Sequence, residues 1–172
     1  MDVVYVDKDD KVIGSGSITY AVDNSIRVRI ARIFLSNSKG EILIQKRSAT
    51  HKSLPNRWDQ TSAGHVDAGE DYDEAAYREL KEEMGIDGVK LTRVKTYYAE
   101  EADESQIKKR FNTLYVGSYD GPVKIDPEEV SDYKWLTLDE LDKQMTNNPD
   151  NFTQGAVESF REYQKYLSSA ID

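Results

Sequence analysis

The stretch "RELKEEMGI", residues 78–86, places Glu79, Glu82 and Glu83 together on what is predicted to be one turn of a helix. Like charges three and four residues apart destabilise a helix by a few tenths of a kcal/mol per pair. The chain already carries a formal net charge of −9 at pH 7, so water or a bound cation must offset this extra repulsion. A solvated acidic helix face and a divalent-cation site are the two interpretations of the triplet.

The predicted helix has recognisable ends and an apolar side. Asp71 with Glu74 three residues later fits a capping box, and Gly85 is expected to end the helix. At roughly 100° per residue, the three glutamates fall within one arc of the helix surface. The neighbouring stripe is apolar and should pack on a sheet: Ala76, Leu80 and Met84. The carboxylates therefore lie at the edge of the buried face, where oxygen ligands suit a hard cation such as Mg²⁺.

The glutamates belong to a longer pattern. From Gly64 to Ile86 the sequence matches Gly-x5-Glu-x7-Arg-Glu-U-x-Glu-Glu-x-Gly-U, with U a bulky aliphatic residue, at every specified position. With average residue frequencies, a chance match in a chain of this length has a probability below roughly one in a million. The segment resembles the box of the Nudix family. The resemblance implies an α/β fold, the Nudix α/β/α sandwich with a mixed β-sheet, and a pyrophosphohydrolase that uses Mg²⁺ or Mn²⁺.

The resemblance also implies roles for individual residues. It assigns metal binding to four positions of the box: Glu79, Glu82, Glu83 and, through its backbone carbonyl, Gly64. The three glutamates are also expected to be catalytic, with Glu79 the first choice as proton acceptor. Arg78 is grouped with the catalytic residues and is expected to brace the loop against the helix through Glu70. Gly85 is structural.

The flanking segments, over roughly residues 3–167, resemble the branch of the family related to isopentenyl-diphosphate isomerase. Ala63 stands where that enzyme has its catalytic cysteine, and the chain contains no cysteine. Lys108, Lys109 and Arg110 stand near its acidic catalytic pair, and the histidines of its metal site have no counterpart around residues 25–31. These departures predict a hydrolase on an isomerase-like frame. An isoprenoid-diphosphate enzyme, either isomerase or phosphohydrolase, and a non-catalytic nucleotide-binding regulator are the alternatives.

Other charged residues are candidates for substrate contact. Lys46 and Arg47 precede the loop at residues 48–57, and Arg57 is its last residue. The three are expected to bind an anionic substrate, although strand-end solubilising charges are the alternative. An acidic segment predicted as a loop offers a further metal ligand or general base: Glu100, Glu101, Asp103 and Glu104. His65 either touches metal or phosphate or, as we expect, is satisfied by local hydrogen bonds. His51 is expected to be exposed.

The 172 residues are expected to form a single Nudix hydrolase domain spanning 1–172. Residues 1–24 read as an N-terminal β-hairpin extension and 64–86 as the box. Predicted strands occupy 26–36, 41–47, 89–99, 107–119 and 130–136. A short capped helix follows at 138–145, and a C-terminal helix is expected at 152–170.

Composition limits the partners. A sequence pI of about 4.8 argues against general nucleic-acid binding. No window approaches the roughly 18 apolar residues of a membrane span, and the N-terminus shows no secretory signal pattern. The expected partner is a small-molecule diphosphate substrate, in the cytoplasm. A homodimer is a candidate assembly, because many Nudix proteins are dimers.

Overall fold

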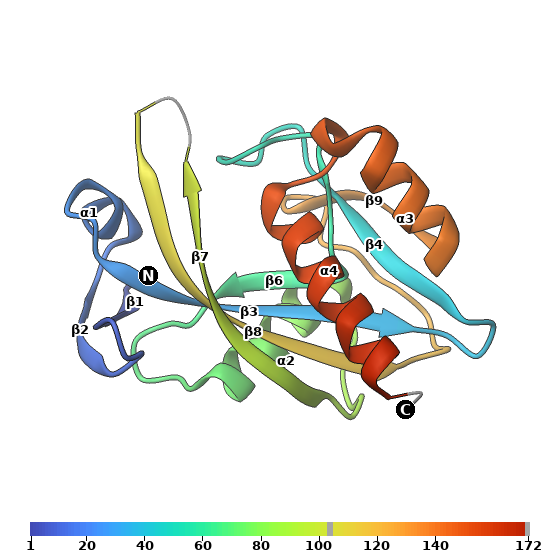
Figure 1. The fold of residues 1–172 in the computed structure, drawn as a ribbon, viewed down its shortest axis with the longest axis horizontal. Coiled ribbons are helices and arrows are strands. Elements are labelled where there is room, and N and C mark those ends of the chain that lie inside the picture. The colour runs from blue at the N-terminus through green and yellow to red at the C-terminus, as the bar shows by residue number, and fades with distance from the viewer. Residues whose placement is uncertain (103–104, 171–172) are drawn as a thin grey trace.

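The computed structural model describes residues 1–102 and 105–170. Within these residues, nine strands form one mixed sheet with helices on both faces, which confirms the predicted α/β fold (Figure 1). The strands are β1 (Val3–Val6), β2 (Val12–Gly16), β3 (Arg27–Ser36), β4 (Glu41–Arg47), β5 (Trp58–Asp59), β6 (Ser62–His65), β7 (Thr92–Ala102), β8 (Ile107–Ser118) and β9 (Val130–Thr137). The helices are α1 (Ile18–Asp23), α2 (Tyr72–Met84), α3 (Leu138–Asn147) and α4 (Gln154–Ser169), with a 3-10 turn at Pro149–Asn151. Across the described ranges, no helix combines the length and the apolar character that a membrane crossing requires.

Strand β3 organises the sheet. On one edge it runs parallel to β8, from Val28 opposite Arg110 to Ser36 opposite Ser118. Its other edge is shared by β1, β6 and β4, all antiparallel to it. β4 meets β3 only at the pair of Ser36 and Ile42 and then pairs with β9 and β5. The short strand β6, whose last two residues are the first two of the Nudix-like segment, is therefore held directly beside the middle of β3.

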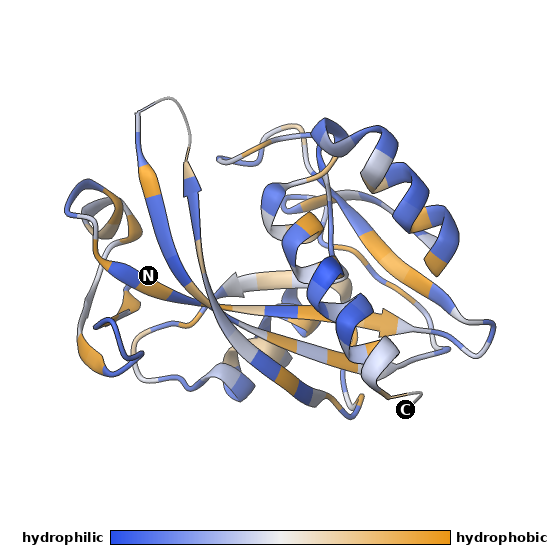
Figure 2. Cartoon of the chain, in the orientation of Figure 1, coloured by the Kyte–Doolittle hydropathy of each residue, from blue (hydrophilic) through white to orange (hydrophobic). Residues whose placement is uncertain are grey.

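Alternate residues of β3 supply two cores on opposite faces of the sheet, as expected for an extended strand. One face, with Ile33 and Leu35, packs against Leu80 of α2. The other face, with Phe34, packs against α3 and α4, and the Phe34 ring stacks on Tyr163 with centroids 5.4 Å apart. Figure 2 shows the resulting hydropathy: β4 is largely orange, whereas α3 is largely blue on its outer side.

Helix α2 begins and ends as predicted. Asp71 accepts a hydrogen bond from Glu74 N, and the Glu74 side chain accepts one from Asp71 N, which completes the capping box. Gly85 ends the helix with a φ of 64°, a left-handed conformation that favours glycine. A Cβ at Gly85 would also lie 2.6 Å from Lys124 O. Local chemistry thus fixes the length of the helix that carries the acidic turn.

The structure corrects two of the predicted elements. The N-terminal hairpin is present as β1 and β2, but residues 18–23 form helix α1, capped by Ser17, rather than part of a strand. The acidic segment 100–106 is not wholly a loop, because β7 continues to Ala102. Glu100 and Glu101 face Lys109 and Lys108 across the β7–β8 ladder, and opposite charges stabilise such cross-strand pairs. Asp103 and Glu104 lie outside the described residues.

The remaining elements fall close to their predicted positions. The loop between the β3 and β4 segments turns at Gly40, which has a φ of 75°. The capping pair Thr137 and Glu140 starts α3 as expected. The C-terminal helix, predicted over 152–170, runs from Gln154 to Ser169, because Thr153 is its N-cap.

Candidate active site

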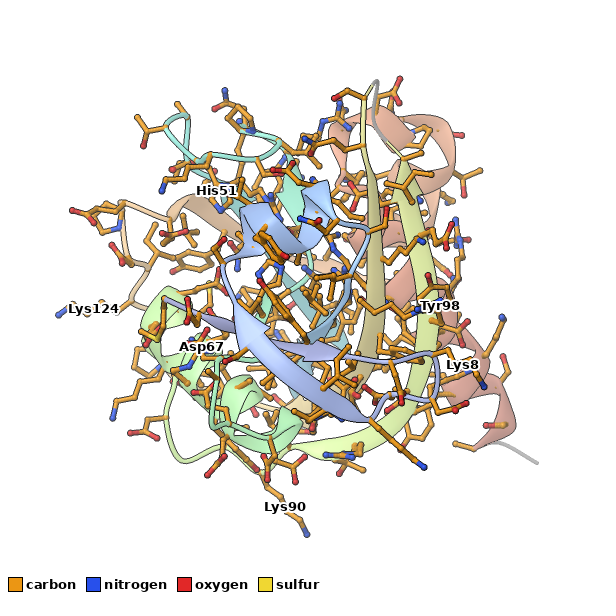
Figure 3. All side chains as sticks on the ribbon, turned by 90° about the vertical axis from the view of Figure 1, so that its left-hand side faces the viewer. Lys8, His51, Asp67, Lys90, Tyr98 and Lys124 are labelled. Carbon is orange, nitrogen blue, oxygen red and sulfur yellow. The ribbon has the colours of Figure 1, made fainter. Side chains whose placement is uncertain are left out.

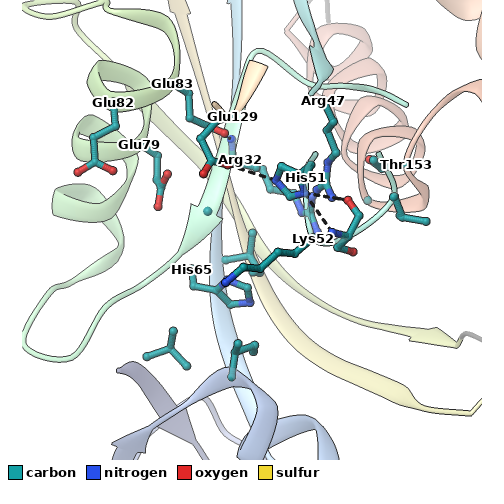
Figure 4. Close-up of a pocket in the computed structure, with 18 of the residues that line it drawn as sticks. Arg32, Arg47, His51, Lys52, His65, Glu79, Glu82, Glu83, Glu129 and Thr153 are labelled. Atoms are coloured by element: carbon teal, nitrogen blue, oxygen red, sulfur yellow. Dashed lines mark hydrogen bonds and ion pairs between the residues drawn. The ribbon is translucent and has the colours of Figure 1, made fainter. Parts of the chain in front are cut away.

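A cavity of about 660 Å³ lies where β6, α2, the 48–57 loop and the start of α4 meet. Figure 4 shows Glu79, Glu82 and Glu83 on one side of β6, and Arg32 and Arg47 on the other. We call the three glutamates the acidic wall. We call the four cations across β6 the basic wall: Arg32, Arg47, Lys52 and Arg110. A substrate in this cavity would meet both kinds of charge.

Arg78 forms ion pairs with several carboxylates on the acidic side of the cavity. Its Nε and Nη2 donate to the two carboxylate oxygens of Glu70, at 2.6 and 2.9 Å, a contact that the predicted brace between these residues requires. Nη2 also donates to His65 O at 3.0 Å, and Nη1 donates to Glu79 Oε1 at 2.7 Å. The Arg78 hydrogen bonds hold the pKa of Glu70 below its usual value, and the same carboxylate raises the pKa of Arg78. Arg78 thus ties the loop before α2 to the helix and positions Glu79.

Glu83 and Glu79 are the shielded members of the acidic wall. Glu83 Oε1 accepts hydrogen bonds from Ser62 Oγ and, at 3.1 Å, from Ala63 N. Burial, followed by the charge of Glu79, raises the pKa of Glu83 to about 8. Burial also raises the pKa of Glu79 to about 7, against the opposing effect of Arg78. Two neighbouring carboxylates that resist ionisation are a setting in which a cation would be bound favourably.

Gly64 is required for this arrangement. A Cβ at position 64 would overlap the carboxylate of Glu79, so only glycine lets that side chain lie against β6. Glu82 is the exposed member, with 60% of its side chain accessible, and it reaches Arg78 Nη1 at 3.3 Å. Among the described residues, no three or more acidic or histidine side chains lie close enough together to form a metal site. Coordination of one ion by all three glutamates would require the exposed end of Glu82 to turn inward.

The basic wall contains one of the three predicted substrate-binding residues. Arg47 lines the cavity, where its Nε donates to Asp59 Oδ2 at 2.9 Å and its Nη1 donates to Ser53 O at 2.6 Å. Lys46 and Arg57 are not among the residues that line it. The Lys46 ammonium lies 5.9 Å from the centre of the Trp58 ring, and Arg57 Nη1 donates to a backbone carbonyl at 3.4 Å. Substrate binding by these three residues stays a prediction.

Arg32 is a cavity residue that the sequence analysis missed, although the sequence holds a signal for it. In "IRVRIARIF", residues 26–34, Arg27 and Arg29 occupy one face of the strand, whereas Arg32 falls on the other face with Ile30 and Phe34. A charge at an apolar position of a central strand indicates a buried, specifically bonded side chain. Arg32 is 6% exposed.

The two histidines differ from their predicted environments. His65 Nε2 is buried with no hydrogen-bond partner among the described residues, contrary to the expectation of local hydrogen bonds. Burial and the nearby charges of Arg110 and Arg32 lower the pKa of His65 to about 3. His51 is half-buried rather than exposed, with Nδ1 2.9 Å from Ser53 O and Nε2 3.3 Å from Glu129 Oε2. Both histidines line the cavity.

The acidic residues predicted as a further metal ligand or general base also differ in their positions. Glu101 reaches the cavity, where its Oε2 accepts from Arg110 Nη1 at 2.5 Å. Glu100 is exposed and accepts a hydrogen bond from Tyr98. Of the two described candidates, Glu101 is therefore the one that lines the cavity, and it lies on the basic side, beside Arg110.

Comparison with known proteins assigns the fold and the box to a family. The profile described as "NUDIX domain" matches residues 26–156. The chain belongs to the Nudix family. It is 35% identical to isopentenyl-diphosphate Delta-isomerase 2 of Photorhabdus laumondii over 152 residues, which cover 88% of this chain and 85% of the relative. It is 30% identical to the uncharacterized Nudix hydrolase YfcD of Escherichia coli K12 over 160 residues, which cover 93% and 84%.

The overall fold is also found among solved structures. The crystal structure of DR0079 from Deinococcus radiodurans superposes with a TM-score of 0.72 at 25% identity and covers 86% of this chain and 90% of that one. Relatives named as isomerases and as Nudix hydrolases thus share this Nudix frame. Membership of the family therefore does not distinguish hydrolysis from isomerisation, and the residues in the cavity have to be considered.

Proposed function

We propose that this protein is a Mg²⁺-dependent Nudix hydrolase that cleaves a diphosphate linkage in a nucleoside di- or triphosphate or a related nucleotide derivative. The observation that carries this proposal is the acidic wall, with Glu79 and Glu83 shielded beside β6, in a cavity that is also lined by the four cationic side chains of the basic wall. A phosphoanhydride is polyanionic, and such a substrate with its cation matches both walls.

The donor set fits Mg²⁺ or Mn²⁺. Glu79, Glu82 and Glu83 would hold the ion, because hard cations take carboxylate oxygens. The raised pKa values of Glu79 and Glu83 support the assignment, since a cation would favour their ionised forms. A divalent ion bound there would neutralise phosphate charge and help a water molecule to ionise.

The residues of the chain then have separable tasks. Arg78 holds the Glu79 carboxylate and the His65 carbonyl in place. Glu79 is our candidate for the group that accepts the proton of the attacking water, because its carboxylate is shielded beside β6 and Arg78 Nη1 holds it in place. Arg47 would contact a substrate phosphate from the opposite wall. The closed side formed by β6 and α2 would keep competing solvent away from Glu83.

The test is a substrate panel. Nucleoside di- and triphosphates, sugar nucleotides, dinucleotides and isoprenoid diphosphates are incubated with the protein in Mg²⁺ or Mn²⁺, and released phosphate and pyrophosphate are measured. The proposal expects turnover of a nucleotide member that disappears when EDTA is added. No release from any panel member, or release that survives EDTA, would contradict it.

An isoprenoid-diphosphate enzyme is the second candidate, because a relative 35% identical over 88% of this chain is named an isopentenyl-diphosphate isomerase. Ala63 in β6 and the absence of cysteine from the sequence argue against the isomerisation itself. Incubation with isopentenyl diphosphate, followed by proton NMR, separates the two. We expect no migration of the double bond, and its observation would favour the second candidate.

A further inference from the structure

The guanidinium of Arg32 is a buried cation that has no ion-pair partner within the described residues. Its Nε donates to Asn112 Oδ1 at 2.8 Å, and its Nη1 lies 3.2 Å from Gln60 Oε1. Both partners are neutral amides, and no carboxylate of the described residues forms an ion pair with Arg32. Buried charges in proteins are normally paired. The side chain is therefore held in a fixed orientation with its charge unbalanced.

The start of α4 increases this imbalance. A Cβ at Gly155 would overlap Arg32 Nη1, so the guanidinium lies directly against the first turn of the helix. Thr153, the N-cap of α4, and Gly155 both line the cavity. The N-terminus of a helix carries a partial positive charge that repels a cation and attracts an anion. Arg32 and α4 together create positive potential at one point of the cavity wall.

Arg110 adds a second cation with an unused donor. Its Nη1 contacts Glu101, but its Nε is buried and has no hydrogen-bond partner within the part of the chain that the structure describes. Burial, followed by the charge of Arg32, lowers the pKa of Arg110 against the opposing effect of Glu101. His65 Nε2, also buried and unpartnered in the described ranges, lines the same two cavities as Arg110.

The carboxylates on this side do not balance the cations. Asp59 is held by Arg47 Nε and by Thr153 Oγ1 at 2.9 Å each. Glu101 is the carboxylate that pairs with Arg110. The three arginines on this side, of which Arg32 is buried, thus outnumber these two carboxylates, and Arg110 Nε is a free donor among the described residues. A multivalent oxyanion would satisfy both the charge and the donor. Arginine suits such an anion because its donors match the spacing of phosphate oxygens.

We propose that Arg32, Arg110 and the first turn of α4 form a phosphate subsite that works without a metal ion. It rests on the proposed function in that it would hold a phosphoryl group of the same substrate, while the acidic wall holds the metal. The subsite would decide which phosphoryl group of the diphosphate faces Glu79 and Glu83, and hence which bond is cut. Such a role extends the basic side beyond Arg47 to residues from β3, β8 and α4.

The test is a calorimetric titration of inorganic pyrophosphate in EDTA, with two variants that act differently. Arg110→Gln removes a charge and the Nε donor. Gly155→Ala keeps every charge but places a methyl group where the Arg32 guanidinium lies. We expect wild type to bind and each variant to bind about tenfold or more weakly, as for the loss of a charge-assisted contact. Circular dichroism checks that each variant is folded.

Two matched controls separate the subsite from general charge effects. Lys90→Gln also removes one positive charge, but this side chain extends into solvent away from the cavity (Figure 3). Gly14→Ala adds a methyl group in β2 where nothing lies within 4 Å. Both are expected to bind pyrophosphate as wild type does.

The outcomes distinguish this inference from the proposed function. If wild type shows no binding in EDTA, or if either folded variant retains wild-type affinity, the subsite is wrong even when hydrolysis in Mg²⁺ is normal. If metal-free binding is lost in the variants as expected, the subsite stands even when no nucleotide is hydrolysed. The hydrolysis assay is run on the same preparations.

Discussion

The two walls of the cavity carry opposite charges and were unequally visible in the sequence. The acidic wall comes from one turn of α2, so Glu79, Glu82 and Glu83 are adjacent in sequence and in space. The basic wall joins Arg32 of β3 to Arg110 of β8 and packs against Gly155 of α4. A motif within one helix can be read directly, whereas a site built by strand pairing and helix packing cannot.

The walls nevertheless share one physical property. On each wall, burial disfavours the charged form of a side chain: it raises the pKa of Glu83 and lowers the pKa of Arg110. Both shifts mean that the charged forms are poorly compensated by the protein itself. A cation on the acidic wall and a phosphate on the basic wall would stabilise these charged forms. Substitutions in the acidic wall should therefore change metal binding and turnover, whereas substitutions in the basic wall should change phosphate binding.

The largest expected effect comes from the acidic wall. Glu82→Gln or Glu83→Gln should lower turnover by about two orders of magnitude or more, because a neutral amide is a poor ligand for a catalytic divalent ion. The fold should persist, since the amide oxygen introduced by Glu83→Gln would still be able to accept the hydrogen bond from Ala63 N. Steady-state kinetics and thermal unfolding measure the two effects.

Asp87→Asn is the matched control for these glutamates. Asp87 is an exposed carboxylate just after α2, paired with Lys81 at 3.0 Å, and its neutralisation should leave turnover unchanged. Normal activity in both glutamine variants would contradict the assignment of these glutamates as metal ligands. An equal loss of turnover in Asp87→Asn would show that the losses come from a general change of charge.

A smaller but still large loss is expected for Gly64→Ala. The new methyl group would overlap the Glu79 carboxylate and displace it from β6. Misplacing a catalytic group by about 1 Å costs about a hundredfold in rate, and partial relaxation should reduce this to about tenfold or more. Kinetics under saturating Mg²⁺ report the change. Full activity would show that the position of Glu79 against β6 is not needed.

The acidic wall should also link metal binding to pH. Because the pKa values of Glu79 and Glu83 are raised, the metal-free fold holds their protons to higher pH than the unfolded chain does. Its stability should therefore fall as pH rises from the ordinary carboxyl pKa of about 4.3 through the raised values. Mg²⁺ competes with these protons, so it should raise Tm by about 3 °C at pH 8.5 and by under about 1 °C at pH 6.

Thermal scans at the two pH values, with Mg²⁺ or with EDTA, measure this linkage. In Glu83→Gln the difference between the pH values should shrink. An increase in Tm that is equal at both pH values would show that Mg²⁺ binds somewhere other than these carboxylates.

The smallest effects are expected among the cations predicted from sequence. Arg47→Lys should raise KM by about fivefold, because the forked donor set is lost while the charge beside Asp59 is kept. Lys46→Gln and Arg57→Gln should change KM by less than about twofold, since neither residue lines the cavity and surface charges contribute little. Initial-rate measurements on the substrate found in the panel give the KM of each variant for comparison. A larger change in Lys46→Gln than in Arg47→Lys would reverse this ranking.

Structural features whose causes lie within one short segment could be predicted from the sequence, and features that depend on contacts between distant segments could not. The ends of α2 follow from Asp71, Glu74 and Gly85 within the segment itself. Helix α1 was missed because "ITYAV" has the composition of a strand, and the Ser17 cap that starts the helix is a short-range detail. The continuation of β7 to Ala102 was missed because Glu100 and Glu101 pair across the sheet with Lys109 and Lys108, which the acidic segment alone does not reveal.

The most direct test of the central claim is a calorimetric titration of Mn²⁺ at pH 8 into wild type and Glu83→Gln, with inorganic pyrophosphate present. The account predicts saturable binding to wild type and an affinity about tenfold or more weaker in the variant, because a shielded ligand has been neutralised. Equal affinity in the two proteins, or no Mn²⁺ binding by wild type, would contradict the assignment of the acidic wall as the metal site.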